Sequence, residues 1–424
     1  MHIHFIFPRW QKLLDDCPEL RETLSGREIG TFCMAGLGIP TAAGAIPPDH
    51  TVSMTDEHVE PVNYNVPADL IALSFFTPQA SNAYAIADRF RAAGRTVVAG
   101  GIHPSMNPEE TLLHADAVIA GPSEGVWEVL LDDFQHGRLE RLYRGTPNAP
   151  FAKPRRELFK ASGYLRAGIV QTARGCDVCC PFCVVHGCNG PGIIRKPIQE
   201  VLDDLRSMSF PCFYFADENL LFNNPSDRAY RNELFDAMKA ERIRKVFFFA
   251  AYPFMLRGLS PEDIQRLAEA GCRQIYLVLG LFDPLCRELT GEGLIETMRR
   301  LQEAGMETMA SFTIGHEEDD PAQTADLIAN LASRSHLNLA EFIIWTPFPG
   351  TPVFQQLEKE GRILTRDWAL YNGAHSVFRP LHETPEALHA RFIHLWRAFY
   401  EKLDTFNVHQ RYAKGFSTGI FNHE

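Results

Sequence analysis

The 424-residue sequence lacks any apolar run of the roughly 18–20 residues that a membrane-spanning helix requires. It also lacks a secretory signal, because the stretch Met1–Arg9 is short, has no basic region and is broken by Pro8. That stretch is more typical of a buried first strand. These absences predict a cytoplasmic protein with no membrane span.

Basic charge is scarce as well. The sequence has 41 Lys and Arg against 53 Asp and Glu, which gives a formal net charge of −12. Binding to nucleic-acid phosphates needs a basic face, so this balance argues against a nucleic-acid partner. The hydrophobic share of 45% is that of an ordinary globular protein, and the length allows two or three domains.

Cysteine, in contrast, is abundant, and its densest group lies in the run Arg174-Gly-Cys-Asp-Val-Cys-Cys-Pro-Phe-Cys183. In a chain without an export signal, such a group indicates metal ligation rather than disulfides. Cys176, Cys180 and Cys183 have the spacing Cys-x3-Cys-x2-Cys. Three thiolates this close can hold three irons of a [4Fe–4S] cube and leave the fourth iron open to a ligand, since a closed cluster takes four cysteines.

Other interpretations of this loop stay open. Cys179 and Cys188 lie in the same segment, and with His186 as a further ligand they could form a zinc knuckle. A disulfide is a third interpretation. The iron–sulfur interpretation is favoured because zinc sites usually come as two separated cysteine pairs, and no second pair follows. Cys179 could replace Cys180 as a ligand, but we treat it as a bystander thiol.

The first 145 residues alternate strand-like and helix-like patterns, which predicts a Rossmann-like, doubly wound parallel sheet. The run from Gly100 to Ser105 follows a strand, where such sheets bind ligands, although a tight turn explains its glycines equally well. Residues 146–165 are predicted to be a linker. The expected strands are Ile3–Phe7, Asp69–Phe75, Thr96–Ala99 and Ala117–Ala120, and the expected helices are Asn82–Ala93 and Glu124–Gly137.

Residues 166–365 show six strand–helix units, which predict a partial (β/α)6 barrel of the TIM type. Chemistry in such barrels lies on the loops after the strands, and the cysteine run follows the first of these strands. Residues 366–424 are predicted to form a C-terminal helical layer. The expected strands are Ile169–Ala173, Cys212–Ala216, Lys245–Ala251, Gln274–Leu279, Thr308–Ile314 and Glu341–Trp345.

With these motifs in place, the chain resembles radical S-adenosylmethionine (SAM) enzymes that carry an N-terminal cobalamin-binding-like domain. This class includes the anaerobic magnesium-protoporphyrin cyclases and the hopanoid and antibiotic C-methylases. Besides the cysteine loop, the matching runs are Ser74–Ala80, Val97–Glu110, His114–Gly121 and Trp345–Pro352. The resemblance implies a [4Fe–4S] cluster, SAM and, in addition, cobalamin as cofactors.

The resemblance also implies a SAM site. Asp217 or Glu218 would bind the SAM ammonium group, and Phe182 and Gly315 would lie near the adenine. The fourth barrel strand of the family ends in Gly-x-Glu-Ser, whose polar groups help to bind the ribose. Here that strand ends in Gly280-Leu-Phe-Asp283, so Asp283 is the remaining polar group.

The resemblance also implies a cobalamin site at the ends of the expected strands Asp69–Phe75 and Thr96–Ala99. Proteins that ligate cobalt through histidine carry the motif Asp-x-His-x-x-Gly. The nearest run in this chain, Asp56-Glu-His-Val-Glu-Pro61, ends in proline instead of glycine. It also lies before the Asp69–Phe75 strand, which is too early in the chain. We therefore do not expect a histidine ligand. The candidate cobalamin contacts are Ser74, Phe75, Gly100, Gly101 and His103.

The function that the resemblance implies is reductive cleavage of SAM with an electron from a low-potential donor, a flavodoxin or ferredoxin. The resulting radical takes hydrogen from a small-molecule substrate, and C-methylation through cobalamin follows. The alternatives are a cobalamin-independent radical cyclase or oxidase, an aminocarboxypropyl transferase, and a non-catalytic iron–sulfur or zinc protein.

Overall fold

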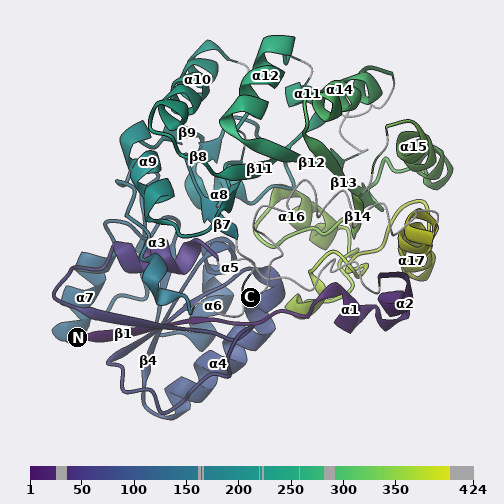
Figure 1. Cartoon of the computed structure of the whole chain (residues 1–424). Helices are drawn as coiled ribbons and strands as arrows, with labels where there is room; N and C mark the ends of the chain where they lie inside the picture. The colour runs from purple at the N-terminus through teal and green to yellow at the C-terminus, as the bar shows by residue number, and fades with distance from the viewer. Residues whose placement is uncertain are drawn as a thin grey trace.

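Two six-stranded sheets organise the molecule (Figure 1). The structure is a computed structural model, and it describes residues 1–24, 36–160, 164, 167–218, 220–221, 224–256, 258–280, 292–335, 337 and 339–401. Both sheets are parallel, as predicted, and the mixed α/β fold class is confirmed. Among the described residues, no helix is both long enough and apolar enough to cross a membrane.

The N-terminal sheet has the strand order β2-β1-β3-β4-β5-β6, the doubly wound order in which ligands bind at the carboxyl ends of the strands. The sequence did not indicate β2 and β6, because both lie at edges of the sheet and mix polar with apolar residues. The strands are β1 (His2–Phe7), β2 (Thr51–Asp56), β3 (Leu70–Ser74), β4 (Thr96–Gly100), β5 (Ala117–Ala120) and β6 (Leu142–Arg144).

Helices cover both faces of this sheet, because successive strand residues point to opposite sides. Phe5 and Ala72 pack toward α3 and α7 on one face, while Ile71 and Leu73 pack toward α4 on the other. The helices of this half are α3 (Gly38–Gly44), α4 (Ala80–Ala92), α5 (Ile102–Met106), α6 (Pro108–His114) and α7 (Trp127–Gln135).

The second sheet is the predicted partial barrel, with the order β7-β10-β11-β12-β13-β14 and with β7 and β14 as its edges. Phenylalanines such as Phe213, Phe247 and Phe312 point outward to the helices and form the main core. The strands are β7 (Ala167–Val170), β10 (Cys212–Phe215), β11 (Val246–Ala251), β12 (Cys272–Gly280), β13 (Glu307–Ile314) and β14 (Leu339–Ile344).

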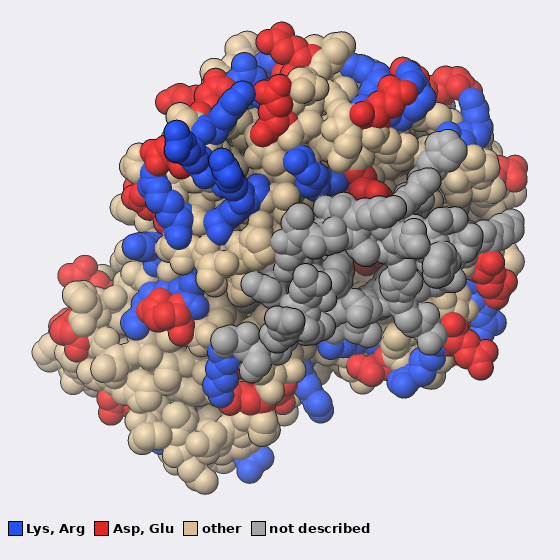
Figure 2. All heavy atoms as spheres, viewed as in Figure 1, with Lys and Arg blue, Asp and Glu red and all other residues tan. Residues whose placement is uncertain are grey.

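The outer helices of the barrel are linked by ion pairs, including Arg228–Asp263 at 2.7 Å and Lys239–Glu269 at 3.2 Å. Figure 2 shows Lys and Arg interspersed with Asp and Glu over these helices, the pattern of a solvated surface. The helices are α9 (Ile198–Ser207), α10 (Pro225–Ala240), α11 (Pro253–Leu256), α12 (Pro261–Ala270), α14 (Glu292–Glu303), α15 (Pro321–Arg334) and α16 (Pro352–Lys359).

The predicted strand Ile169–Ala173 is instead two elements. β7 ends at Val170, and β8 (Ala173–Cys176) pairs in antiparallel fashion with β9 (Gly192–Arg195) in a separate two-stranded sheet. The cysteine loop therefore starts from the β8–β9 hairpin, which stands on the carboxyl end of the barrel, and it ends in α8 (Val185–Asn189).

Segments from both ends of the chain cross between the two halves. α1 (Leu13–Asp16), α2 (Arg21–Leu24) and the 3-10 turn Pro18–Leu20 between them belong to the predicted N-terminal domain, yet Leu20 and Leu24 pack in the barrel core. Figure 1 shows them beside α17 (Pro385–Glu401). Conversely, Trp368 and Tyr371, which come from the C-terminal part of the chain, pack against the N-terminal sheet.

α17 also covers the edge strand β14. The Tyr400 hydroxyl accepts the Ala340 N–H at 3.1 Å and donates to the Ala340 carbonyl at 2.6 Å. The side chain thus pairs backbone groups at the sheet edge. The domain boundaries expected from the sequence stay predictions. Each sheet lies within one predicted domain, but the flanking segments pack on the other half of the molecule.

Candidate active site

Cys176, Cys180 and Cys183 line one cavity of about 420 Å³, here called the cluster cavity, together with Phe182 and Glu218. The β8–β9 hairpin positions the first of these cysteines, because Cys176 pairs with Gly192. The chain then turns through a bend that the Cys183 N–H closes by donating to the Cys180 carbonyl at 3.1 Å. The local backbone therefore turns all three thiols toward the same space.

Backbone N–H groups point at two of these sulfurs. The Val178 N–H donates to Cys176 Sγ at 3.4 Å, and the Val185 N–H donates to Cys183 Sγ at 3.5 Å. Such donors favour the thiolate form that iron requires. Burial acts the other way and raises the pKa of both thiols.

The remaining cysteines of the loop lie elsewhere. Cys179 is exposed, with its sulfur 3.8 Å from His186 Nδ1, and Cys188 Sγ lies 3.9 Å from the Ile102 carbonyl oxygen. Within the described ranges, no three His, Cys, Asp or Glu side chains converge on a point that could hold a single metal ion. A four-iron cube is larger than one ion, and each cysteine binds a different iron, so the three thiols that share the cluster cavity fit a cube better than zinc.

The two predicted ammonium ligands differ in their surroundings. Asp217 accepts hydrogen bonds from Thr172 N at 2.7 Å, Thr172 Oγ1 at 2.7 Å and Ala173 N at 2.6 Å, and it is 4% exposed. Its carboxylate thus holds the turn between β7 and β8. Burial raises its pKa to about 6 against the effect of these donors.

Glu218, in contrast, lines the cluster cavity. Burial, with a smaller contribution from the neighbouring Asp217 charge, raises its pKa to about 7. A carboxylate in this position gains from a cationic ligand, since an ammonium group both pairs its charge and donates hydrogen bonds to it.

Among the other predicted SAM contacts, Phe182 and Gly280 line the cluster cavity. Phe182 also packs against Trp345, and the Pro181 carbonyl before it accepts the Val353 N–H at 3.2 Å. Gly315 follows β13 in the left-handed region at φ +85°, packed against Leu388. Asp283 lies outside the described residues.

A second cavity of about 340 Å³, here called the sheet-edge cavity, lies at the carboxyl ends of β3, β4 and β5. The predicted cobalamin contacts Ser74, Phe75, Gly100 and Gly101 line it, and it continues between the sheet face and α3, where Ala72 forms part of its wall. Its volume suits the nucleotide tail of a cobalamin rather than the whole corrin. Trp127 also lines it, and Trp127 Nε1 has no hydrogen-bond partner among the described residues.

The backbone conformation at position 101 explains why this residue is a glycine. It has φ +102°, and a Cβ there would lie 2.7 Å from the Phe75 carbonyl oxygen, so the turn admits no larger residue. His103 does not line the sheet-edge cavity. It is fully buried between Tyr84 and Thr77, and burial lowers its pKa to about 3.

The Asp56–His58 pair follows the edge strand β2. His58 Nδ1 lies 3.0 Å from Asp56 Oδ1, and the Trp10 N–H donates to His58 Nε2 at 3.4 Å. Both ring nitrogens of His58 therefore have protein partners, and His58 lines a different cavity from Gly100 and Gly101. The absence of a histidine ligand to cobalt stays a prediction.

Two groups near these cavities were not identified from the sequence. Arg174 and Glu124 form a buried pair in the wall of the sheet-edge cavity. Glu341 lies on β14 inside the barrel. A signal for Glu341 was available, because it is the lone charge in the strand Leu339-Ala-Glu-Phe-Ile-Ile344.

Comparison with protein families gives two matches. Residues 48–131 match the B12 binding domain, and residues 170–328 match the radical SAM superfamily. The first range contains β2 to β5, and the second contains the cysteine loop with the barrel strands from β10 to β13.

Among curated proteins, the chain is 28% identical over 380 residues to bacteriochlorophyllide d C-8(2)-methyltransferase of Chlorobaculum tepidum, covering 82% of this chain and 81% of that protein. It is 27% identical over 355 residues to bacteriochlorophyllide d C-12(1)-methyltransferase of the same organism, covering 78% and 75%. Among solved structures, it resembles the radical SAM methyltransferase TsrM from Kitasatospora setae, determined with cobalamin and a [4Fe-4S] cluster bound. The TM-score is 0.63 at 15% identity, covering 85% of this chain and 75% of that one.

Proposed function

From a chain that joins a B12-binding domain to a radical SAM domain, we propose a cobalamin-dependent transfer of a methyl group from SAM to carbon of a small organic molecule. The predicted combination of the two domains and the assignment as a radical SAM enzyme are confirmed by the family matches. The methyl transfer is the proposal, and it is supported by the methyltransferase names of the relatives.

One observation carries the proposal. Glu218 lines both the cluster cavity and the sheet-edge cavity, so the two cavities adjoin at this side chain. A methyl carrier held at the sheet edge and SAM held at the cluster would then lie next to each other. A radical cyclase without cobalamin has no use for the sheet-edge cavity.

The residues have distinct roles in this proposal. Cys176, Cys180 and Cys183 would each bind one iron, and Glu218 would accept hydrogen bonds from the SAM ammonium. Phe182 and Gly280 would flank SAM in the cluster cavity. When bound, the cluster and SAM supply a one-electron reductive cleavage, and cobalamin supplies the methyl carrier.

The sheet edge would bind cobalamin through shape rather than through a ligand to cobalt. Ser74, Phe75, Gly100 and Gly101 would border the corrin, and the groove beside Ala72 would take the nucleotide tail. A flavodoxin or ferredoxin would supply the electron. Two curated relatives act, by their names, on bacteriochlorophyllide d, so this carboxylated macrocycle is the first acceptor to test.

The test is an anaerobic assay of protein reconstituted with iron, sulfide and cobalamin, with methyl-labelled SAM, a reductant and bacteriochlorophyllide d. We expect labelled product and deoxyadenosine together, and neither from Cys183→Ala protein. Deoxyadenosine with an unlabelled, altered acceptor would favour a cyclase or oxidase. Transfer of label from the carboxyl carbon of SAM, and not from its methyl group, would favour an aminocarboxypropyl transferase.

A further inference from the structure

Two more cavities adjoin the cluster cavity in a row. The inner cavity, of about 310 Å³, shares Ile343, Asn372 and Gly373 with the cluster cavity. The mouth cavity, of about 720 Å³, shares Trp10 and His58, among others, with the inner cavity. Pro78 lines all three. The row therefore leads from the surface, past the open edge of the barrel at β14, to the cluster cysteines.

The walls of the inner cavity and of the cluster cavity are mainly aromatic and aliphatic, whereas the lining of the mouth cavity is mainly polar. Trp10, Phe392 and Trp396 line the inner cavity, and Trp345 and Phe348 line the cluster cavity beyond it. Pockets for drug-sized ligands measure about 300–1,000 Å³. The inner and mouth cavities together suit a ligand at the upper end of that range, with its apolar ring system against the aromatic wall of the inner cavity.

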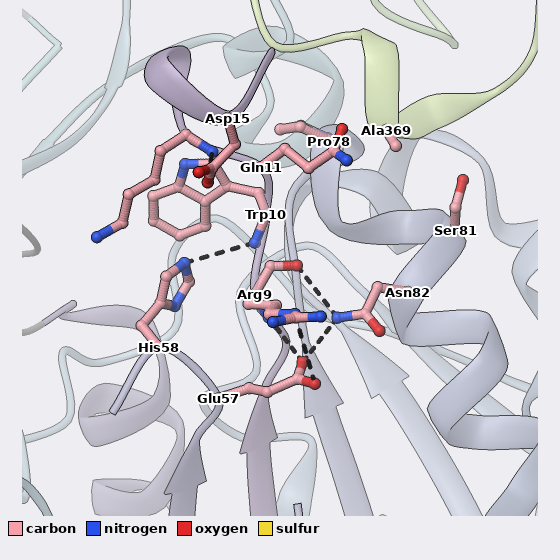
Figure 3. Close-up of a pocket in the computed structure, with 11 residues that line it drawn as sticks. Arg9, Trp10, Gln11, Asp15, Glu57, His58, Pro78, Ser81, Asn82 and Ala369 are labelled. Atoms are coloured by element: carbon pink, nitrogen blue, oxygen red, sulfur yellow. Dashed lines mark hydrogen bonds and ion pairs between the residues drawn. The ribbon is translucent and has the colours of Figure 1, made fainter. Parts of the chain in front are cut away.

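Two of the charged side chains at the mouth, Arg9 and Glu57, are paired with each other. Glu57 accepts the Arg9 N–H at 3.0 Å and the Asn82 side-chain amide at 2.6 Å, and the Arg9 guanidinium lies 4.0 Å from the same carboxylate (Figure 3). The figure also shows Trp10 and His58 on the other side of the cavity. The Glu57 carboxylate is thus already satisfied by protein groups, and a further acidic group lies deeper in the row.

Glu341 is that deeper group. It lines the inner cavity, and the Tyr276 hydroxyl donates a hydrogen bond to its Oε2. Tyr276 lies on β12 and Glu341 on β14, so the bond crosses β13 inside the barrel, where Ser311 faces Glu341 in the strand register.

The fold gives Glu341 no evident structural role as a charged side chain. It forms no ion pair within the described part of the chain, and it interrupts a strand that is otherwise apolar. Burial raises its pKa, which favours the neutral form. A neutral carboxylic acid whose Oε2 accepts a bond from tyrosine can donate its own proton to a further oxygen.

We propose that the inner and mouth cavities hold the methyl acceptor, and that Glu341, fixed by Tyr276, donates a hydrogen bond to a neutral oxygen of that molecule. The acceptor is then a large, mostly apolar ring system with a carbonyl or hydroxyl oxygen, and this bond positions its reacting carbon at the cluster cavity. The inference rests on the proposed methyl transfer. Glu341 is a positioning residue, since it does not line the cluster cavity itself.

The experiment compares Glu341→Leu, Glu341→Gln and Tyr276→Phe in the reconstituted holoenzyme, with bacteriochlorophyllide d as the probe. We expect Glu341→Leu to raise KM about tenfold, the loss of one buried hydrogen bond, and to lower the ratio of methylated product to deoxyadenosine. Glu341→Gln keeps a donor and should stay within about threefold of the wild type. Tyr276→Phe should lie between the two.

Deoxyadenosine formation without the acceptor is the internal control, and it should not change in any variant. Wild-type KM and product ratio in Glu341→Leu would overturn the inference, and so would equal losses in the Leu and Gln variants, because an ionised Glu341 would then be required. Should Glu341→Leu fail to fold, Tyr276→Phe keeps the ring and tests the same contact. If the wild-type protein methylates no acceptor at all, it is the proposed function that fails.

Binding of the macrocycle can be measured separately from its methylation. Trp10, Trp345 and Trp396 line the row, so the macrocycle should quench protein fluorescence on binding. Trp10→Phe should reduce this quenching, whereas Trp368→Phe, which alters a core residue outside the three cavities, should leave it in place. Equal quenching in the wild type and in Trp10→Phe would place the macrocycle elsewhere.

Discussion

Arg174 and Glu124 form a buried ion pair, with 2.5 Å between Nη2 and Oε1 and 6% of each side chain exposed. Arg174 lies on β8, two residues before the first cluster cysteine, and Glu124 follows β5 of the N-terminal sheet. The Arg174 guanidinium also lies 4.7 Å from the centre of the Phe151 ring. The pair therefore fixes the cluster loop relative to the sheet-edge cavity.

Removing one partner of this pair should destabilise the protein strongly. Glu124→Ala leaves a buried charge without compensation, which costs about 3–5 kcal/mol. The double variant Glu124→Leu/Arg174→Met should recover most of that loss. Urea unfolding measures both. The matched control is Glu157→Ala in the exposed Arg155–Glu157 pair, which should change the free energy of unfolding by at most about 1 kcal/mol.

The three cysteines that share the cluster cavity should be the cluster ligands. Cys176→Ala, Cys180→Ala and Cys183→Ala should each abolish reductive SAM cleavage and most iron binding, because an open-site cube needs all three thiolates. Iron content and deoxyadenosine formation are the measurements. Cys179→Ala and Cys188→Ala should retain both properties. A protein that needed Cys179 and not Cys180 would refute this ligand set.

Glu218 and Asp217 should respond differently to the same change. Glu218→Gln should weaken SAM binding by about 1.5–3 kcal/mol, the contribution of a hydrogen bond to a charged group, without loss of iron. Asp217→Asn should instead lower the free energy of unfolding, because the amide cannot accept all three hydrogen bonds from Thr172 and Ala173. Isothermal titration with SAM and urea unfolding separate these outcomes, and unchanged SAM affinity in Glu218→Gln would remove Glu218 from the site.

Filling the sheet-edge groove should expel cobalamin selectively. Ala72 lines this groove, so Ala72→Leu places a larger side chain where the nucleotide tail would lie. We expect the variant to lose bound corrin, measured by its absorption spectrum, while it keeps the cluster and deoxyadenosine formation. Ala92→Leu, at an exposed position of α4, is the matched control. Gly101→Val would be a poorer probe, since the valine side chain would collide with the Phe75 backbone.

His103 should make the protein sensitive to acid. Its folded pKa of about 3 lies below the unfolded value of 6.5. Between these values the unfolded chain binds a proton that the native protein does not, so the free energy of unfolding falls as the pH falls. The slope is at most about 1.4 kcal/mol per pH unit. From pH 6.5 to 5 the wild type should lose about 2 kcal/mol more than His103→Gln, and His136→Gln, on the surface, should behave as the wild type.

Elements with local signals were predicted well from the sequence. The signals of α12 are all local: Ser260 caps it, Pro261 begins it and Gly271 ends it in the left-handed region. The division of Ile169–Ala173 into β7 and β8 had no local signal. The N–H groups of Thr172 and Ala173 donate to Asp217, a residue more than forty positions away, so the break depends on a long-range contact.

The site was predictable to a similar degree. Cysteine spacing indicated the cluster loop, because all three ligands lie in one turn of chain. The orientation of His103 could not be predicted, since the neighbouring residues Gly101 and Ile102 line the sheet-edge cavity and His103 points into the core. The sequence also could not show that Asp217 holds the turn between β7 and β8 while Glu218 lines the cluster cavity, because this difference depends on the break between the two strands.

The Tyr400 hydroxyl occupies the place that a further strand would take beside β14. A recombinant fragment that stops before α17 would leave Ala340 without that partner and the strand edge uncovered. Uncovered edges recruit strands from other molecules, so such a fragment would aggregate during expression. Shortened versions of this protein should therefore be designed to keep the chain through Tyr400.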